Sequence, residues 1–402
     1  MQSIDHYSKS AIEFTVHWQE QGVSHQDSTW ADPVSFWRDV LHPGLVRDLL
    51  GQGVGGQAIV DIPAEDFIQP FDPKKRIIIR PEQFRGHDRF GNDIELRPGR
   101  YYPQGQLQGV DGVFRVSAAP CRFLGREGDR LHFDLNHPLA GRDLRLQATI
   151  RAIHPPGKER GGRCEDWLEK VTAGGPGMQT LLEKGQLSQL SADDRMRVDD
   201  RPDQAFYKQS RLVHHLDSSA RRAIGDLYGR LIPEDARVLD LMGSWDSHLP
   251  EELEIESLTV LGLNAEELRH NTRARKNVIH DLNASPQLPF ADAAFDAVLC
   301  TASIEYLIDP QAFIAEIHRV LRTDGLAAIA FSNRWFPPKA IRIWTELHEF
   351  ERLGLVADLL AANGNFHDLA TCSRRGLPRP EDDPHQELPL SDPVFMAWGF
   401  AD

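Results

Sequence analysis

From about residue 207 to the C-terminus, segments with helical periodicity alternate with short apolar runs. The helical segments are SSARRAIGDLYGRLI and QAFIAEIHRVL, and the apolar runs are RVLDLM, LTVLGLN, AFDAVLCTA and GLAAIAFSN. Strands and helices in alternation fold into a parallel sheet that is covered by helices on both faces. Residues 206–402 are therefore predicted to form an α/β, Rossmann-like doubly wound sheet.

The first part of the chain, residues 1–155, has a different pattern. Short strand-like runs such as QAIVDI, KRIIIR, DGVFRVSAA, RLHFDL and LRLQATIRAI are broken by Gly, Pro and Asp, which predicts a mostly β structure. Residues 156–205 are rich in Gly, Arg, Asp and Gln, as in GKERGGRCEDW, and are predicted to be a linker region. A chain of 402 residues is long enough for two or three domains, so we expect a multidomain protein.

The composition excludes several classes of protein. A formal net charge of -15 argues against a nucleic-acid binder, which needs a basic surface. The four cysteines are far apart and form no CxxC pair, so neither a disulfide framework nor a metal site is expected. The N-terminal residues lack the pattern of a signal peptide, and no run approaches eighteen apolar residues. We therefore expect a soluble cytoplasmic protein with neither nucleic-acid nor membrane partners.

In an open parallel sheet, ligands bind beyond the carboxyl ends of the strands. Four such ends follow in order: LMGSWDS after Asp240, then GLNAEEL, then IHDLN with LPFADAAFDAVLC, and finally TASIEYL. This ordered series, with VLRTDGLAAIAFSNR after it, resembles the class I S-adenosylmethionine (SAM)-dependent methyltransferases of the type 11 group. The resemblance covers roughly residues 207–402 and implies SAM (S-adenosyl-L-methionine) as the cofactor.

The resemblance also implies which residues hold SAM. Its methionine part is matched by the first loop, its ribose by Asn264, where the family usually has Asp or Glu, and its adenine by Asp281. An amide oxygen can still accept a hydrogen bond from a ribose hydroxyl. The family's loop has two or three glycines where this chain has Met242, Gly243, Ser244 and Trp245, and Trp245 is expected to cover or narrow the site. The predicted cofactor-binding residues are Asp240, Gly243, Ser244, Asn264, Asp281, Leu282 and Thr301.

Methyl transfer needs an acceptor held in line with the methyl group and, for some acceptors, a base such as histidine. The predicted catalytic residues are His215, His248, Tyr306 and Arg334. The predicted substrate-binding residues are Tyr207, His214, Asp217, Trp245, Glu305 and Asn333. Each has a structural alternative: a lone histidine is often part of the packing, and Asp217 before SSARRAI can be a helix N-cap.

In the first part, LHPGLVRDLLGQGVGGQAIVDIPAEDF and GDRLHFDLNHPLAGRDLRLQATIRAI are similar to SlyD-like FKBP-type peptidyl-prolyl isomerases. The resemblance implies a β-rich α+β domain with a flap inserted at about residues 80–139. Phe67 stands where the family has a groove tyrosine, and Gln26 and Asp27 compete for the place of its acidic residue. The family's histidine-rich tail is absent, so nickel binding is not implied. We expect a poor isomerase that binds unfolded or proline-containing segments.

Three functions remain open at this stage. The first is a methyltransferase for a small-molecule acceptor, with a small thiol or similar nucleophile ranked first because thiolates react readily near neutral pH. In the second, the isomerase-like domain presents a protein for methylation. The third is an interaction protein that has lost both activities. A small acceptor needs a closed pocket and a protein side chain an open one, and Trp245 with RWFPPKAIRIW favours closure.

Overall fold

The computed structural model describes residues 2–87, 94–155 and 161–402, which fall into two compact units. The first unit comprises Met1–Glu20, Gln26–Gln186 and His348–Gly354, and the second comprises Gln21–His25, Leu187–Leu347 and Leu355–Asp402. Parts of the predicted flap (88–93) and of the predicted linker (156–160) lie outside the described residues. Each unit is described by itself.

The first unit is β-rich, as predicted, and contains two sets of paired strands. One set has the order β2–β1–β8–β3, formed by β1 (Lys9–Glu20), β2 (Val23–Ser35), β3 (Gln57–Ile62) and β8 (Leu144–Ile153). The other has the order β4–β7–β6–β5, formed by β4 (Arg76–Ile79), β5 (Tyr101–Pro103), β6 (Pro120–Glu127) and β7 (Arg130–Asp134). The short helices are α1 (Pro43–Leu49) and α2 (Trp167–Thr172).

Two parts of the sequence reading differ from the structure. The run DGVFRVSAA, residues 111–119, forms no strand, and its Phe114 and Val116 are 71% and 93% exposed. Among the described residues, no neighbouring strand pairs with this run. Its apolar side chains therefore have no cross-strand neighbours to pack against, and a strand conformation is not stabilised. The predicted linker is largely packed, because Trp167 and Val171 of α2 are buried in the first unit's core and the Trp167 ring stacks on Phe14 at 5.7 Å.

The second unit is the predicted doubly wound α/β structure. Its strand order is β11–β10–β9–β12–β13–β15–β14. The strands β9 (Ala236–Leu241), β10 (Ile255–Gly262), β11 (Lys276–Ile279), β12 (Phe295–Thr301) and β13 (Leu321–Phe331) are parallel. The strand β15 (Val394–Ala401) is antiparallel to both β13 and β14 (Phe366–Arg375). The order reverses between β9 and β12, which is where such sheets bind ligands.

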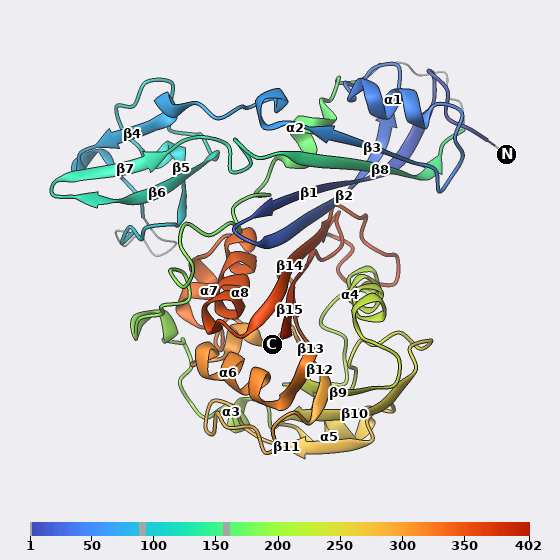
Figure 1. Ribbon diagram of the computed structural model, residues 1–402, viewed down its shortest axis with the longest axis vertical. Helices are drawn as coiled ribbons and strands as arrows, with labels where there is room; N and C mark the ends of the chain where they lie inside the picture. The colour runs from blue at the N-terminus through green and yellow to red at the C-terminus, as the bar shows by residue number, and fades with distance from the viewer. Residues whose placement is uncertain (1, 88–93, 156–160) are drawn as a thin grey trace. The chain divides into compact units, whose positions relative to one another are not determined.

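Helices flank this sheet, with α4 (Ser218–Leu231) on one face and α6 (Pro310–Val320) on the other (Figure 1). Both were predicted, because their apolar residues recur at helical spacing and are buried in the structure. The remaining helices are α3 (Asp203–Phe206), α5 (Ala265–His270), α7 (Arg342–Glu346) and α8 (Glu349–Asn363). In the part of the chain that the structure describes, no helix combines the length and apolar character needed to cross a membrane.

Phe331, at the end of β13, anchors the packing on one side of the sheet. Its ring stacks on Phe395 with centroids 5.4 Å apart and meets Trp344 edge-on at 4.8 Å, and all three side chains are buried. We expect Phe331→Ala to lower the free energy of unfolding by about 3–5 kcal/mol, because it removes a buried ring and leaves a cavity. Urea denaturation measures the loss. The exposed Phe114→Ala is the control and should stay within about 0.5 kcal/mol; equal effects of the two changes would contradict the packing.

Candidate cofactor and acceptor site

A pocket lies at the carboxyl ends of β9, β10 and β12, where the strand order reverses. It contains about 1200 Å³ of empty space, including open solvent at its mouth. Most residues predicted for the site line it, namely Tyr207, His214, His215, Asp240, Gly243, Ser244, Trp245, His248, Asn264, Asp281, Leu282, Thr301 and Tyr306. The parallel strands thus bring together residues that are up to about a hundred positions apart in the chain.

Asp240 is the next-to-last residue of β9 and is almost completely buried. Its Oδ2 accepts a hydrogen bond from the Ser247 hydroxyl at 2.6 Å, and burial raises the pKa of its carboxyl to about 6. A Cβ atom added to Gly243 would lie 2.5 Å from this Oδ2, and one added to Gly262 would lie 2.3 Å from the Gly243 carbonyl oxygen. The two glycines therefore let the ends of β9 and β10 approach each other around the carboxylate.

The loop after β9 keeps a glycine-like path although it has few glycines. Met242 has a φ of 56°, in the left-handed region that glycine adopts at little cost. Met242 therefore carries a side chain in a backbone conformation that glycine, the residue expected from the resemblance, would favour. A non-glycine residue in this region costs of order 1 kcal/mol, which the packing of the loop must offset.

The predicted role of Asn264 does not fit its contacts. Its side-chain oxygen accepts hydrogen bonds from the backbone N–H groups of Glu266 and Glu267 at 3.0 and 3.2 Å and caps α5, while its Nδ2 donates to the Tyr207 carbonyl at 2.9 Å. The oxygen expected to accept from ribose is thus already used. The neighbouring carboxylate of Glu267 lines the pocket instead, where Oε2 accepts from the Ser244 hydroxyl at 2.7 Å.

At the next strand end, Asp281 forms a turn. Its Oδ1 accepts from the backbone N–H groups of Asn283 and Ala284 at 3.1 and 3.2 Å, and for Oδ2 the described part of the chain shows no hydrogen bond. Asp281 therefore keeps an acceptor for the adenine amino group that the resemblance assigns to it. Thr301 hydrogen-bonds with the Tyr228 hydroxyl at 2.7 Å, which fixes the end of β12.

The segment 207–216 is fastened beside the loop after β9. The Trp245 indole N–H donates to the Val213 carbonyl at 3.4 Å, and its ring lies 4.3 Å from that of His214. Asp246 lies 3.4 Å from His214 Nδ1 and 3.2 Å from His248 Nδ1. Burial alone would raise the pKa of Asp246, but the hydrogen bond and charge of His248 hold it below its usual range.

Aromatic rings form another wall of the pocket. Tyr306 accepts a hydrogen bond from the Phe336 backbone N–H at 2.9 Å, and the Tyr207, Tyr306 and Phe336 rings lie within 6.5 Å of one another. His215 meets the Phe336 ring edge-on at 5.1 Å. Burial, and next the charge of Arg211, lower the pKa of His215, so its ring is neutral and can accept a proton at neutral pH.

The remaining predicted residues, Asp217, Glu305, Asn333 and Arg334, are not among those that line the pocket. Asp217 caps α4 by accepting from the Ala220 N–H at 2.8 Å, which was the structural alternative for this residue. Glu305 is fully buried and Asn333 is exposed at the surface. Arg334 lies 3.5 Å from the His215 carbonyl and 3.7 Å from an Asp392 carboxylate oxygen, so it packs behind His215.

Sequence reasoning missed several residues that line the pocket: Asp203, Arg211, Asp246, Glu267, Asn283 and Phe336. Glu267 had a detectable signal, because it follows Asn264 by three positions and so lies on the same face of α5. Arg211 lies between Tyr207 and His214, which were both predicted for the site, but no motif marked it.

Residues 244–329 match the family model of a methyltransferase domain. This methyltransferase domain covers β10 to β13 and the pocket residues between them, and it indicates SAM as the cofactor. Among solved structures, a SAM-dependent methyltransferase from Thermotoga maritima is 16% identical over 49% of this chain and 96% of its own, with a TM-score of 0.36. One from Aquifex aeolicus is 15% identical over 47% and 92%, with a TM-score of 0.30. No curated protein matches the chain.

The close approach of the β9 and β10 ends in the second unit can be tested at Gly262. We expect Gly262→Ala to weaken binding of S-adenosylhomocysteine by about tenfold or more, because the added carbon would lie 2.3 Å from the Gly243 carbonyl oxygen and push the loop away. Calorimetric titration of the full chain measures this. Gly53→Ala is the matched control, since its added carbon would meet only the Gln2 carbonyl at 3.4 Å; a Gly262 variant with unchanged affinity would refute the account.

Proposed function

We propose that this protein is a SAM-dependent methyltransferase that acts on a small-molecule acceptor. The choice of a small-molecule acceptor rests on the hydrogen bonds that hold residues 207–216 in place. The backbone of this segment is tied by the Arg211 N–H to Glu267 at 2.7 Å, by the Tyr207 carbonyl to Asn264 at 2.9 Å, and by the Val213 carbonyl to Trp245. A covering segment held at three points suits a small acceptor better than an extended protein chain.

The pocket has groups that fit SAM. The buried carboxylate of Asp240, which Gly243 approaches closely because it has no side chain, and the acceptor oxygens of Glu267 and Asp281 match a ligand with an ammonium group, ribose hydroxyls and an adenine. When bound, SAM supplies an activated methyl group on a sulfonium. No glycine-rich diphosphate cradle is needed, because SAM has no pyrophosphate.

The chain's own residues would orient the acceptor and handle its proton. The rings of Tyr207, Tyr306 and Phe336 exclude water from one side of the pocket, and their faces attract positive charge. A ring nitrogen of His215 would take the proton of a thiol, phenol or amine. A small thiol ranks first, because it ionises most readily near neutral pH and needs least help from a base.

The pH dependence of SAM binding follows from Asp240. Burial raises the pKa of this carboxyl to about 6, above its ordinary value. The protonated carboxyl therefore stabilises the folded protein at low pH, and this stabilisation is lost as the pH rises through about 6. A cationic ligand needs the charged form. We therefore expect SAM affinity to rise about fivefold from pH 5 to pH 6, to reach about ten times the pH 5 value at pH 7, and to level off above that, as measured by calorimetry. Asp240→Asn should abolish this rise; a flat wild-type profile would contradict the role of Asp240.

A methyl-transfer screen tests the acceptor. Full-length protein is incubated with methyl-labelled SAM and small thiols, phenols, amines or denatured protein, and label is followed in each fraction. We expect label in a small molecule and a fall in kcat of about a hundredfold or more for His215→Ala with an acceptor whose proton must be removed. Arg222→Gln, on an exposed position of α4, is the control. Label only in protein, with His215→Ala unaffected, would remove both the small-acceptor and the His215 assignments.

The SlyD-like character of the first unit remains a proposal. It is supported by the separate β4–β7–β6–β5 set, whose strands lie in the chain between β3 and β8, which pair with each other. Efficient isomerisation is disfavoured, because Phe67 is only 2% exposed and its ring packs edge-on against His137 at 5.2 Å. A buried phenylalanine cannot line the open apolar groove that a proline needs. We propose a folded accessory domain that binds unfolded or proline-containing segments.

A further inference from the structure

Among the charged side chains that line the pocket, the carboxylates have partners and the one guanidinium has no carboxylate partner in the described structure. Its five carboxylates all have partners: Asp203 with Arg197 and Lys339, Asp246 with His214 and His248, Glu267 with Ser244, Asp281 with backbone N–H groups, and Asp240 with Ser247. Arg211 is the single arginine or lysine among the lining residues. Within residues 2–87, 94–155 and 161–402, no carboxylate lies within 4.0 Å of its guanidinium.

The Arg211 guanidinium is nevertheless held in place. Its central carbon lies 5.0, 5.3 and 5.9 Å from the ring centroids of Phe206, Phe336 and Tyr207. Its one hydrogen bond to the described chain runs from Nη2 to the Phe206 carbonyl at 3.3 Å. A guanidinium has five N–H donors, so most of them remain available to a ligand. Stacking restricts the side chain beforehand, which lowers the entropy cost of binding an oxyanion.

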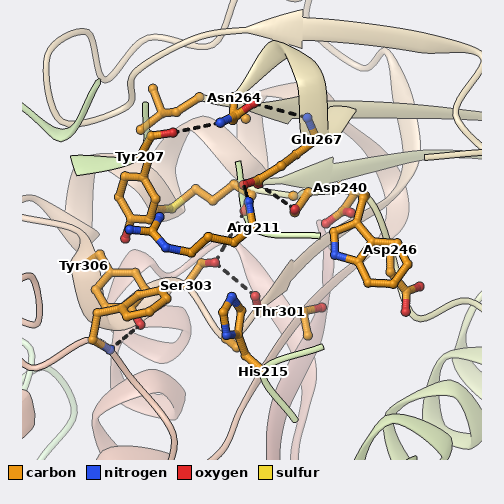
Figure 2. A pocket seen from close by; sticks show the side chains of 18 of the residues that line it. Tyr207, Arg211, His215, Asp240, Asp246, Asn264, Glu267, Thr301, Ser303 and Tyr306 are labelled. Atoms are coloured by element: carbon orange, nitrogen blue, oxygen red, sulfur yellow. Dashed lines mark hydrogen bonds between the residues drawn. The ribbon is translucent and has the colours of Figure 1, made fainter. Parts of the chain in front are cut away.

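A second donor lies nearby. The Tyr207 hydroxyl is buried and has no hydrogen-bond partner in the described structure. Burial raises its pKa, so it stays protonated and able to donate. Figure 2 shows the ends of the Tyr207 and Arg211 side chains on the same side of the pocket. An unpaired buried hydroxyl beside a partly unpaired cation marks a place where a ligand oxygen would satisfy both.

The guanidinium lies on the acceptor side of the pocket. It packs on Phe336, which follows β13, and on Tyr207, which packs against Tyr306 after β12. The residues assigned to ribose and adenine follow β10 and β11, which lie on the other side of β9 in the strand order. We propose that Arg211, with the Tyr207 hydroxyl, receives a carboxylate or phosphate of the acceptor, so that the substrates are small anionic molecules. This inference rests on the proposed function.

Matched pairs of acids and amides test the inference directly. Full-length protein saturated with S-adenosylhomocysteine is titrated by calorimetry with mercaptopropionate, para-hydroxybenzoate and ortho-aminobenzoate, and with the amide of each. We expect at least one acid to bind about ten- to a hundredfold more tightly than its amide, as expected for charge-assisted hydrogen bonds. In Arg211→Gln the acid should lose this preference to within about threefold. Arg211→Lys should keep part of it, and the exposed Arg222→Gln should keep all of it.

Each other outcome has a distinct meaning. Equal binding of acid and amide, no binding of any acid, or a preference that survives in Arg211→Gln would overturn the inference. S-adenosylhomocysteine is also compared with methylthioadenosine, which lacks the amino acid part. If Arg211→Gln weakened only the former, Arg211 would hold the cofactor's own carboxylate, and the acceptor assignment would fall. If wild-type protein bound no S-adenosylhomocysteine, the proposed function itself would fail; binding of it with no acid preference would overturn the inference alone.

Discussion

The buried carboxylate of Asp240 is the constraint on which the pocket depends. It lies next to the end of β9, where the strand order reverses, and a carboxylate that is removed from water must be satisfied by its surroundings. Ser247 supplies a hydrogen bond at 2.6 Å, and Asn271 in turn donates to the Ser247 hydroxyl at 2.9 Å and to the Ser244 carbonyl at 3.1 Å. The loop after β9 therefore curls around Asp240, and Gly243 is required because any side chain there would collide with it.

The covering segment depends on that loop in turn. Trp245 and Asp246 follow directly after it and contact Val213 and His214, so the position of residues 207–216 is set by the same turn that encloses Asp240. Glycines could not do this, because they have no side chain to offer. Trp245 therefore supplies an anchor for the segment beside the pocket.

The sequence predicted the second unit well because its evidence is local and repeated. Helical spacing located α4 and α6, and the rule for parallel strands brought Asp240, Asp281 and Thr301 to one pocket. It was less decisive where a polar side chain can either bind a ligand or cap a helix, an alternative that the sequence already left open for Asp217. Asn264 and Asp217 are polar residues placed directly before helices, and their side chains cap those helices. Trp167, in a glycine-rich stretch, was taken as linker because composition says nothing about distant packing partners such as Phe14.

The division of charge in the pocket explains how such a site favours methyl transfer. Four carboxylates, of Asp240, Asp246, Glu267 and Asp281, lie at or just after the ends of β9, β10 and β11, and the fifth, of Asp203, is paired with Arg197 and Lys339. The one guanidinium packs on the ring of Phe336, which follows β13. When an anionic nucleophile meets a sulfonium, charge is neutralised as the new bond forms, and a water-poor setting favours that change. The same water-poor pocket makes it unfavourable to bind either charged group without a partner of opposite charge. In the proposed binding mode, the carboxylates near SAM and the guanidinium of Arg211 near the acceptor would give each charge its own partner and so reduce that cost.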